Sequence, residues 1–197
     1  GIVATGASVP EFQAKLSYDF KVNEDIKNIR ISGSGIWQRT TVNSAAGFNT
    51  NQPGVTAMAG DVLIKGNVYD FEPVLYYYQG IGVGTTGLFL NGFSATGNRR
   101  VSNGGYAQIS HAFGKWKPSF SYGLSRLNLA SGDVNSAVAQ GTLVHFNRMR
   151  TQQLQYSLTK SVTLVEEFST IRDQGQGGGV QSYNYATAIS LGAILFF

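Results

Sequence analysis

The chain has 197 residues, of which 13% are charged and 25 are glycine, with a formal net charge of +4 and no cysteine. Soluble globular chains carry about 25% charged residues and about 7% glycine, so this composition is unusual for a surface in water. It excludes disulfides and thiolate chemistry, offers no basic stripe for nucleic acid, and contains no apolar run near the ~20 residues of a membrane helix.

The hydrophobic pattern has a period of two along nearly the whole chain. In residues 11–20 the even positions from Phe12 onward are apolar and the odd positions are polar. Residues 29–40 repeat the alternation, with Ile36 as an exception in the polar row. Such alternation is typical of a half-buried strand. We therefore predict nine strands and no amphipathic helix, the strands covering residues 11–20, 29–40, 55–65, 72–82, 104–114, 117–127, 148–158, 161–172 and 183–197.

The connections between these segments alternate between short and long. The short ones are 21–28, 66–71, 115–116 and 159–160, and the long ones are 41–54, 83–103, 128–147 and 173–182. Transmembrane β-barrels have short turns at one end and long loops at the other. Aromatic residues at the ends of the apolar rows suit interfacial girdles, and closure is required because unpaired backbone groups are costly in hydrocarbon. The sequence therefore predicts an all-β, transmembrane, antiparallel up-and-down β-barrel.

One glycine-rich stretch, Gly82 to Gly87, fits the glycine spacing of dinucleotide-binding folds. That motif requires a following helix and an acidic residue about 20 positions later. Residues 88–103 are rich in glycine, asparagine and serine, and no acidic residue occurs between Glu72 and Asp133. The glycines instead predict the place where a strand leaves the barrel rim, at Gly80, Gly82 and Gly84.

A polar row along the strands is expected to face the barrel lumen. Its candidate pore-lining residues are Lys15, Arg30, Gln38, Asp61, Lys65, Gln153, Gln155 and Glu167. Rings of charge bias ion permeation, although the same side chains could equally be hydrated filler of the lumen. Glu166 falls in the lipid-facing row, where a charge at mid-depth is costly. Arg148 and Arg150 raise the same difficulty unless they lie above the bilayer.

The residues give little support for catalysis. His111 and His145 are the only histidines, neither is near a carboxylate in sequence, and two histidines alone make no convincing metal site. His111 shares the parity of Ile109 and Phe113, which predicts a girdle position. His145, in a predicted outer loop, is the candidate for a rim hydrolase. No catalytic residue, metal or cofactor is predicted. The Arg99-Arg100 pair is either a ligand for lipopolysaccharide or a solute, or a solvated loop tip.

Four stretches carry a resemblance to the C-terminal half of Gram-negative general porins: "YYYQGIGVGTTGLFLNG", "GGYAQISHAFGKWKPSFSYGLS", "LQYSLTKSVTLVEEFS" and "ISLGAILFF". The resemblance spans most of residues 11–197 and implies a 16-stranded, usually trimeric barrel that passes small hydrophilic solutes. The terminal row resembles the signal read by the outer-membrane assembly machinery, here Leu191, Ala193, Leu195 and Phe197. Glu166 stands where a small apolar residue is usual, and the family's early acidic loop has no match.

We therefore expect residues 1–197 to form a single domain with about nine strands of a larger barrel. The alternative is a complete small barrel of eight or ten strands. The expected function is a non-enzymatic diffusion channel in the bacterial outer membrane. Its expected partners are membrane lipids, lipopolysaccharide, two further copies of the chain and the assembly machinery, but no nucleic acid. The other functions left open are a barrel anchor or adhesin without a channel, a rim hydrolase and a soluble β-sandwich lectin.

Overall fold

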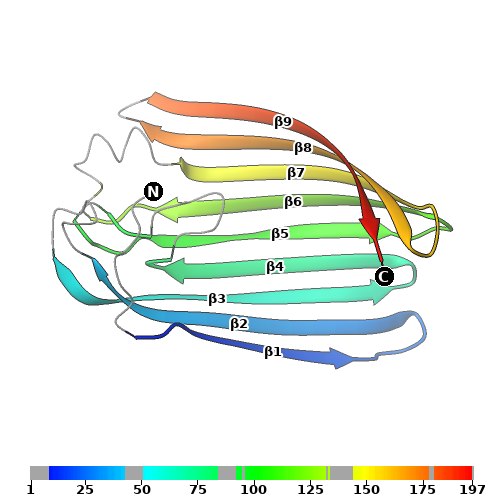
Figure 1. Cartoon of the computed structure of the whole chain (residues 1–197), viewed down its shortest axis with the longest axis horizontal. Coiled ribbons are helices and arrows are strands. Elements are labelled where there is room, and N and C mark those ends of the chain that lie inside the picture. The colour runs from blue at the N-terminus through cyan, green and yellow to red at the C-terminus, as the bar shows by residue number, and fades with distance from the viewer. Residues whose placement is uncertain are drawn as a thin grey trace.

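The computed structural model describes residues 9–42, 51–83, 92–94, 96–131, 133, 144–177 and 180–196. These residues form one sheet of nine strands in sequence order, and every neighbouring pair is antiparallel (Figure 1). The strands are Phe12–Phe20 (β1), Ile26–Val42 (β2), Gln52–Val68 (β3), Phe71–Ile81 (β4), Val101–His111 (β5), Trp116–Asn128 (β6), Val144–Ser157 (β7), Val162–Gly177 (β8) and Val180–Leu195 (β9). The prediction of nine antiparallel strands is confirmed. Among the described residues there is no helix long and apolar enough to span a membrane.

The sheet is open rather than closed into a ring. β1 is hydrogen-bonded to β2 alone and β9 to β8 alone among the described strands. Figure 1 shows these two strands at opposite edges of the sheet. Each edge therefore presents backbone N–H and C=O groups that no strand of the described chain satisfies.

Alternate side chains separate into two faces with different chemistry. Residues directly opposite in an antiparallel ladder share a face, so the register Tyr18↔Ile31↔Ile64↔Leu75 defines an apolar row on one side. We call this side the outer face. The apolar core is correspondingly small, and its buried members are Ala57, Leu127 and Ala130. No second layer of the described chain covers the outer face.

Six strands, β2, β3 and β6–β9, are longer than the hydrophobic pattern predicts, and the extension of β8 and β9 changes the connection between them. β8 continues to Gly177 and β9 begins at Val180, so the expected long connection over residues 173–182 is wrong, and the alternation of short and long connections ends there. Polar cross-strand contacts maintain the ladder. The Arg172 guanidinium lies 4.2 Å from the Tyr183 ring, and Asp173 is paired with Asn184. Because the extended parts of β8 and β9 lack an alternating apolar row, the hydrophobic pattern of the sequence does not reveal their pairing.

The glycine-rich end of β4 forms the predicted exit from the sheet. The strand stops at Ile81, and Gly82 adopts φ 69°, a left-handed conformation that favours glycine. The Gly82 N–H donates to the Arg100 carbonyl at 2.9 Å, which ties the outgoing chain to the returning chain. Gly84 lies outside the described residues. The strand end predicted at these glycines is confirmed at Gly82.

Candidate functional site

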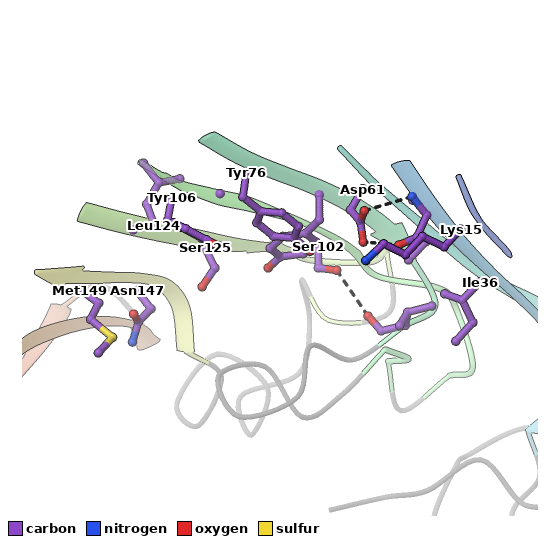
Figure 2. Close-up of a pocket in the computed structure, with 18 of the residues that line it drawn as sticks. Lys15, Ile36, Asp61, Tyr76, Ser102, Tyr106, Leu124, Ser125, Asn147 and Met149 are labelled. Carbon is purple, nitrogen blue, oxygen red and sulfur yellow. Dashed lines mark hydrogen bonds between the residues drawn. The ribbon is translucent and has the colours of Figure 1, made fainter. Parts of the chain in front are cut away.

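The eight predicted pore-lining residues all lie on the face opposite the apolar rows, which we call the inner face. The ladders place Lys15 opposite Ser34 and Ser34 opposite Asp61. By the same rule of register, Arg30 is opposite Lys65, Gln153 is opposite Glu167, and Gln38 and Gln155 fall on the same side. The inner face is hollowed into a cavity of about 950 Å³ whose lining comes from β1 through β7 (Figure 2).

Asp61 is the acidic centre of this cavity. The Ser34 backbone N–H donates to Asp61 Oδ1 at 3.1 Å, and the Ser34 hydroxyl donates to Oδ2 at 2.6 Å. Figure 2 shows Lys15 and Asp61 entering the same space from two strands separated only by β2. These bonds fix the direction of the carboxylate, so the cavity contains a localised negative charge beside a cation.

Tyrosine side chains form the middle of the cavity wall. The Tyr76 ring lies 5.3 Å from the Tyr106 ring and 6.1 Å from the Tyr78 ring, measured between centroids. All three residues line the cavity. The sequence analysis did not select them, although their positions match the inward parity of β4 and β5. Their rings take up space in the cavity, and their hydroxyls supply polar groups without adding charge.

Ion pairs neutralise the cations near the turn end of the inner face. Arg30 donates to both Asp19 carboxylate oxygens at 2.8 Å. Glu72 lies 2.9 Å from the Lys117 ammonium and 3.9 Å from that of Lys65. The side chains are partly exposed, so solvent screens these pairs and they add little to stability. Their main effect is on the local field, because the like charges Arg30 and Lys65 stand directly opposite each other.

Three of these charged residues, Asp19, Glu72 and Lys117, were missed in the sequence analysis. Their parity alone indicates the inner face. The pairing of Glu72 with Lys117 spans 45 positions and becomes visible only when the strand register is known.

A second polar group lies across the sheet on β7 and β8. Gln153 donates to Glu167 at 3.3 Å, Gln155 donates to Gln153 at 2.7 Å, and Ser169 donates to Glu167 at 3.0 Å. The structure therefore divides the predicted set. Lys15, Arg30, Asp61 and Lys65 gather on β1–β3, the β7–β8 group stands apart, and Gln38 lies toward the loop end opposite Ala57. The inner face is a distributed polar surface rather than one convergent site.

Polar side chains dominate this surface. Among the described residues, no three His, Cys, Asp or Glu side chains gather as a metal site requires. His145 was predicted to lie in a loop, but it lies in β7, and its Nδ1 contacts the Leu127 carbonyl. His111 lies on the outer face and stacks on Phe71 with a centroid distance of 4.3 Å. His111 therefore has the outward parity expected from the sequence.

Arg99 and Arg100 of the long loop both contact other parts of the chain. Arg100 is 4% exposed and makes a bidentate ion pair with Asp133, at 2.7 and 2.6 Å. Arg99 donates to the Thr56 carbonyl at 3.1 Å. The interpretation of Arg100 as a solvated loop tip or an external ligand is therefore wrong. The buried ion pair joins the chain after β4 to the chain after β6. No sequence pattern indicated this role, because the two residues are 33 positions apart.

The outer face holds the terminal apolar row and the unexpected charges. Leu191 and Leu195 of β9 are 79% and 58% exposed and share this face with Ala193, whereas Phe197 lies outside the described residues. Glu166 is also on the outer face, opposite Leu154 and Leu191. Arg148 and Arg150 occupy the same face of β7.

Comparisons with family models, curated proteins and solved structures gave no match for this chain. The fold by itself defines a class: an open, nine-stranded, antiparallel up-and-down sheet with a hollowed polar face and an exposed apolar face. Inference of function therefore rests on the chemistry of those two faces.

Proposed function

We propose that this chain forms wall strands of a water-filled β-barrel channel in the bacterial outer membrane, through which small hydrophilic solutes and ions diffuse passively. One observation carries the proposal: uncovered apolar side chains dominate one face of all nine strands and polar side chains dominate the other, apart from Glu166 and four arginines of β6–β8 on the apolar face. A barrel wall between lipid and water demands this division.

The exposed outer face supports contact with hydrocarbon. Large apolar side chains remain open on every strand, including Leu16 at 81% and Ile189 at 70%. Monomeric soluble proteins rarely expose contiguous apolar patches above a few hundred Å². Placing this face in lipid removes the cost of its hydration, at roughly 25 cal/mol per Å² of apolar area.

The spacing of the aromatic residues fits the thickness of a membrane. Trp116 and Tyr156 are in tilted contact near the turn end, with ring centroids 4.5 Å apart. Tyr156 marks this first aromatic level, and its partner on β8 is Leu164. Eight residues further along β8, Arg172 is opposite Tyr185, which marks the second level. At ~3.3 Å per residue and a tilt of about 40°, these two aromatic levels are about 20 Å apart. An outer-membrane barrel has an apolar band of about 25 Å.

The open edges require partners in a membrane. Unpaired backbone groups of β1 and β9 would cost several kcal/mol each in hydrocarbon, so further strands must close the ring. The porin resemblance supplies the rest of the proposal: 16 strands in all, three copies of the barrel, and recognition of the outward β9 row by the assembly machinery. A barrel without a channel, acting as an anchor or adhesin, is the alternative.

The inner face suggests weak ion selectivity. Its strand residues include four cations, Lys15, Arg30, Lys65 and Lys117, and five anions, Asp19, Asp61, Glu72, Glu167 and Asp173. Because the signs are mixed and mostly paired, the lumen field of these strands is small. Permeation is then governed mainly by width, to which the tyrosine wall contributes.

Single-cysteine labelling in planar bilayers tests the proposal, because the native chain has no cysteine. We expect stepwise ohmic openings from the purified full-length protein. A negatively charged methanethiosulfonate reagent should change the conductance of the inward variant Ser121→Cys and leave the adjacent outward variant Phe120→Cys unchanged. A silent membrane would favour the anchor, and equal effects at both positions would refute the assignment of faces.

A further inference from the structure

The outer face carries a compact basic cluster on three neighbouring strands. Its members are Arg126 on β6, Arg148 and Arg150 on β7, and Arg172 on β8. Arg148 is directly opposite Arg172, and Arg126 is opposite Phe146. Residues directly opposite in an antiparallel pair have Cβ atoms about 5 Å apart, so Arg148 and Arg172 are close neighbours, and Arg126 and Arg150 lie within two ladder positions of Arg148.

This cluster lacks an internal counter-charge. None of the four arginines takes part in the ion pairs found among the described residues. Glu166 is the one outward carboxylate in the described strands, and the ladder places it four positions from Arg150, about 13 Å, and six from Arg172, about 20 Å. Like charges placed directly opposite in a sheet are destabilising, so an anion from outside the chain would relieve the repulsion.

Aromatic side chains flank the guanidinium groups of the cluster. Three of them lie over aromatic rings: Arg148 over Phe146 at 4.7 Å, Arg150 over Tyr122 at 6.0 Å and Arg172 over Tyr183 at 4.2 Å. A guanidinium that contacts a ring through its flat face keeps the N–H groups along its edge available. Arginine uses that edge for bidentate hydrogen bonds to phosphate oxygens.

The position of the cluster along the strands indicates which partner it binds. Arg148 and Arg172 are opposite each other at the level of Tyr185, the aromatic level on the long-loop side. We propose that Arg126, Arg148, Arg150 and Arg172 bind the phosphate groups of lipopolysaccharide in the outer leaflet. This inference rests on the proposed outer-membrane function. A second copy of the chain fits less well, because its described outer face offers Glu166 alone as a carboxylate.

Binding of bis-phosphorylated lipid A to the full-length protein in detergent micelles tests the cluster. The variant Arg148→Gln/Arg172→Gln should bind at least tenfold more weakly than the wild type. The matched control Lys21→Gln/Lys160→Gln removes two positive charges from short connections and should stay within twofold. Lipid A without phosphates should compete poorly, and so should phosphatidylglycerol.

Three results would overturn the inference: unchanged affinity of the arginine variant, equal binding of dephosphorylated lipid A, or equal competition by phosphatidylglycerol. A change of oligomer size without a change of lipid A affinity would assign the patch to a second copy instead. If the double variant does not fold, Arg172→Gln alone carries the comparison. Bilayer conductance of the same proteins separates the two hypotheses: normal channels with unaltered lipid A binding refute the lipid site alone, whereas absent channels in the wild type refute the proposed function.

Discussion

The substitution Phe120→Arg places a charge on the outer face close to the middle of the proposed membrane. Phe120 is 45% exposed and follows Trp116 by four residues on β6. At ~3.3 Å per residue and about 40° of tilt, it lies about 10 Å above that aromatic level, near the centre of the ~25 Å apolar band. An arginine at that depth of a barrel costs about 2–4 kcal/mol.

The neighbouring substitution Ser121→Arg is the matched control, because it adds the same side chain to the inner face. Ser121 lines the open cavity between Gln108 and Thr151, so its cost should stay near 0.5 kcal/mol, as for an ordinary surface change. The assay is reversible guanidinium unfolding from phosphocholine vesicles. Equal losses for both variants, or a larger loss for Ser121→Arg, would refute the assignment of faces.

Three further results follow from the side-chain contacts. Arg100→Met should destabilise the fold by about 3–5 kcal/mol, because Asp133 is left as a buried unpaired charge, and unfolding midpoints should recover when Asp133→Leu is added. Glu72→Gln frees the Lys117 ammonium, so the reversal potential in a KCl gradient should shift toward anions; an unchanged potential would contradict a lumen position. Tyr106→Ala should raise single-channel conductance by opening the tyrosine wall, and a smaller conductance would contradict its role in setting the width.

The strands could be predicted because their signal is local. In β1, apolar and polar residues alternate without exception, and nothing beyond the segment is needed to identify the strand or its two faces. The same parity was enough to place Lys15 and Asp61 on one face. The short connections also followed from the sequence, since a strand must end where the alternation ends.

Longer-range features could not be predicted from the pattern. The extension of β8 past Arg172 depends on polar pairs with β9, which hydrophobic alternation cannot register. The Arg100–Asp133 pair joins residues 33 positions apart through two loops. The tyrosine wall requires the register between β4 and β5, since Tyr76 is opposite Tyr106 only in that alignment. The alternation of residue types predicted the two faces, whereas the contacts between residues on each face became known only from the structure.

Spin-label accessibility along β9 tests most directly whether the outer face meets lipid and the inner face meets water. Single cysteines at residues 188–191, labelled with a nitroxide in vesicles of the full-length protein, would report collisions with oxygen and with a water-soluble nickel chelate. We predict high oxygen accessibility at Ile189 and Leu191, and high nickel accessibility at Ala188 and Ser190. Four positions with the same ratio of accessibilities, or the opposite alternation, would contradict the proposed membrane wall.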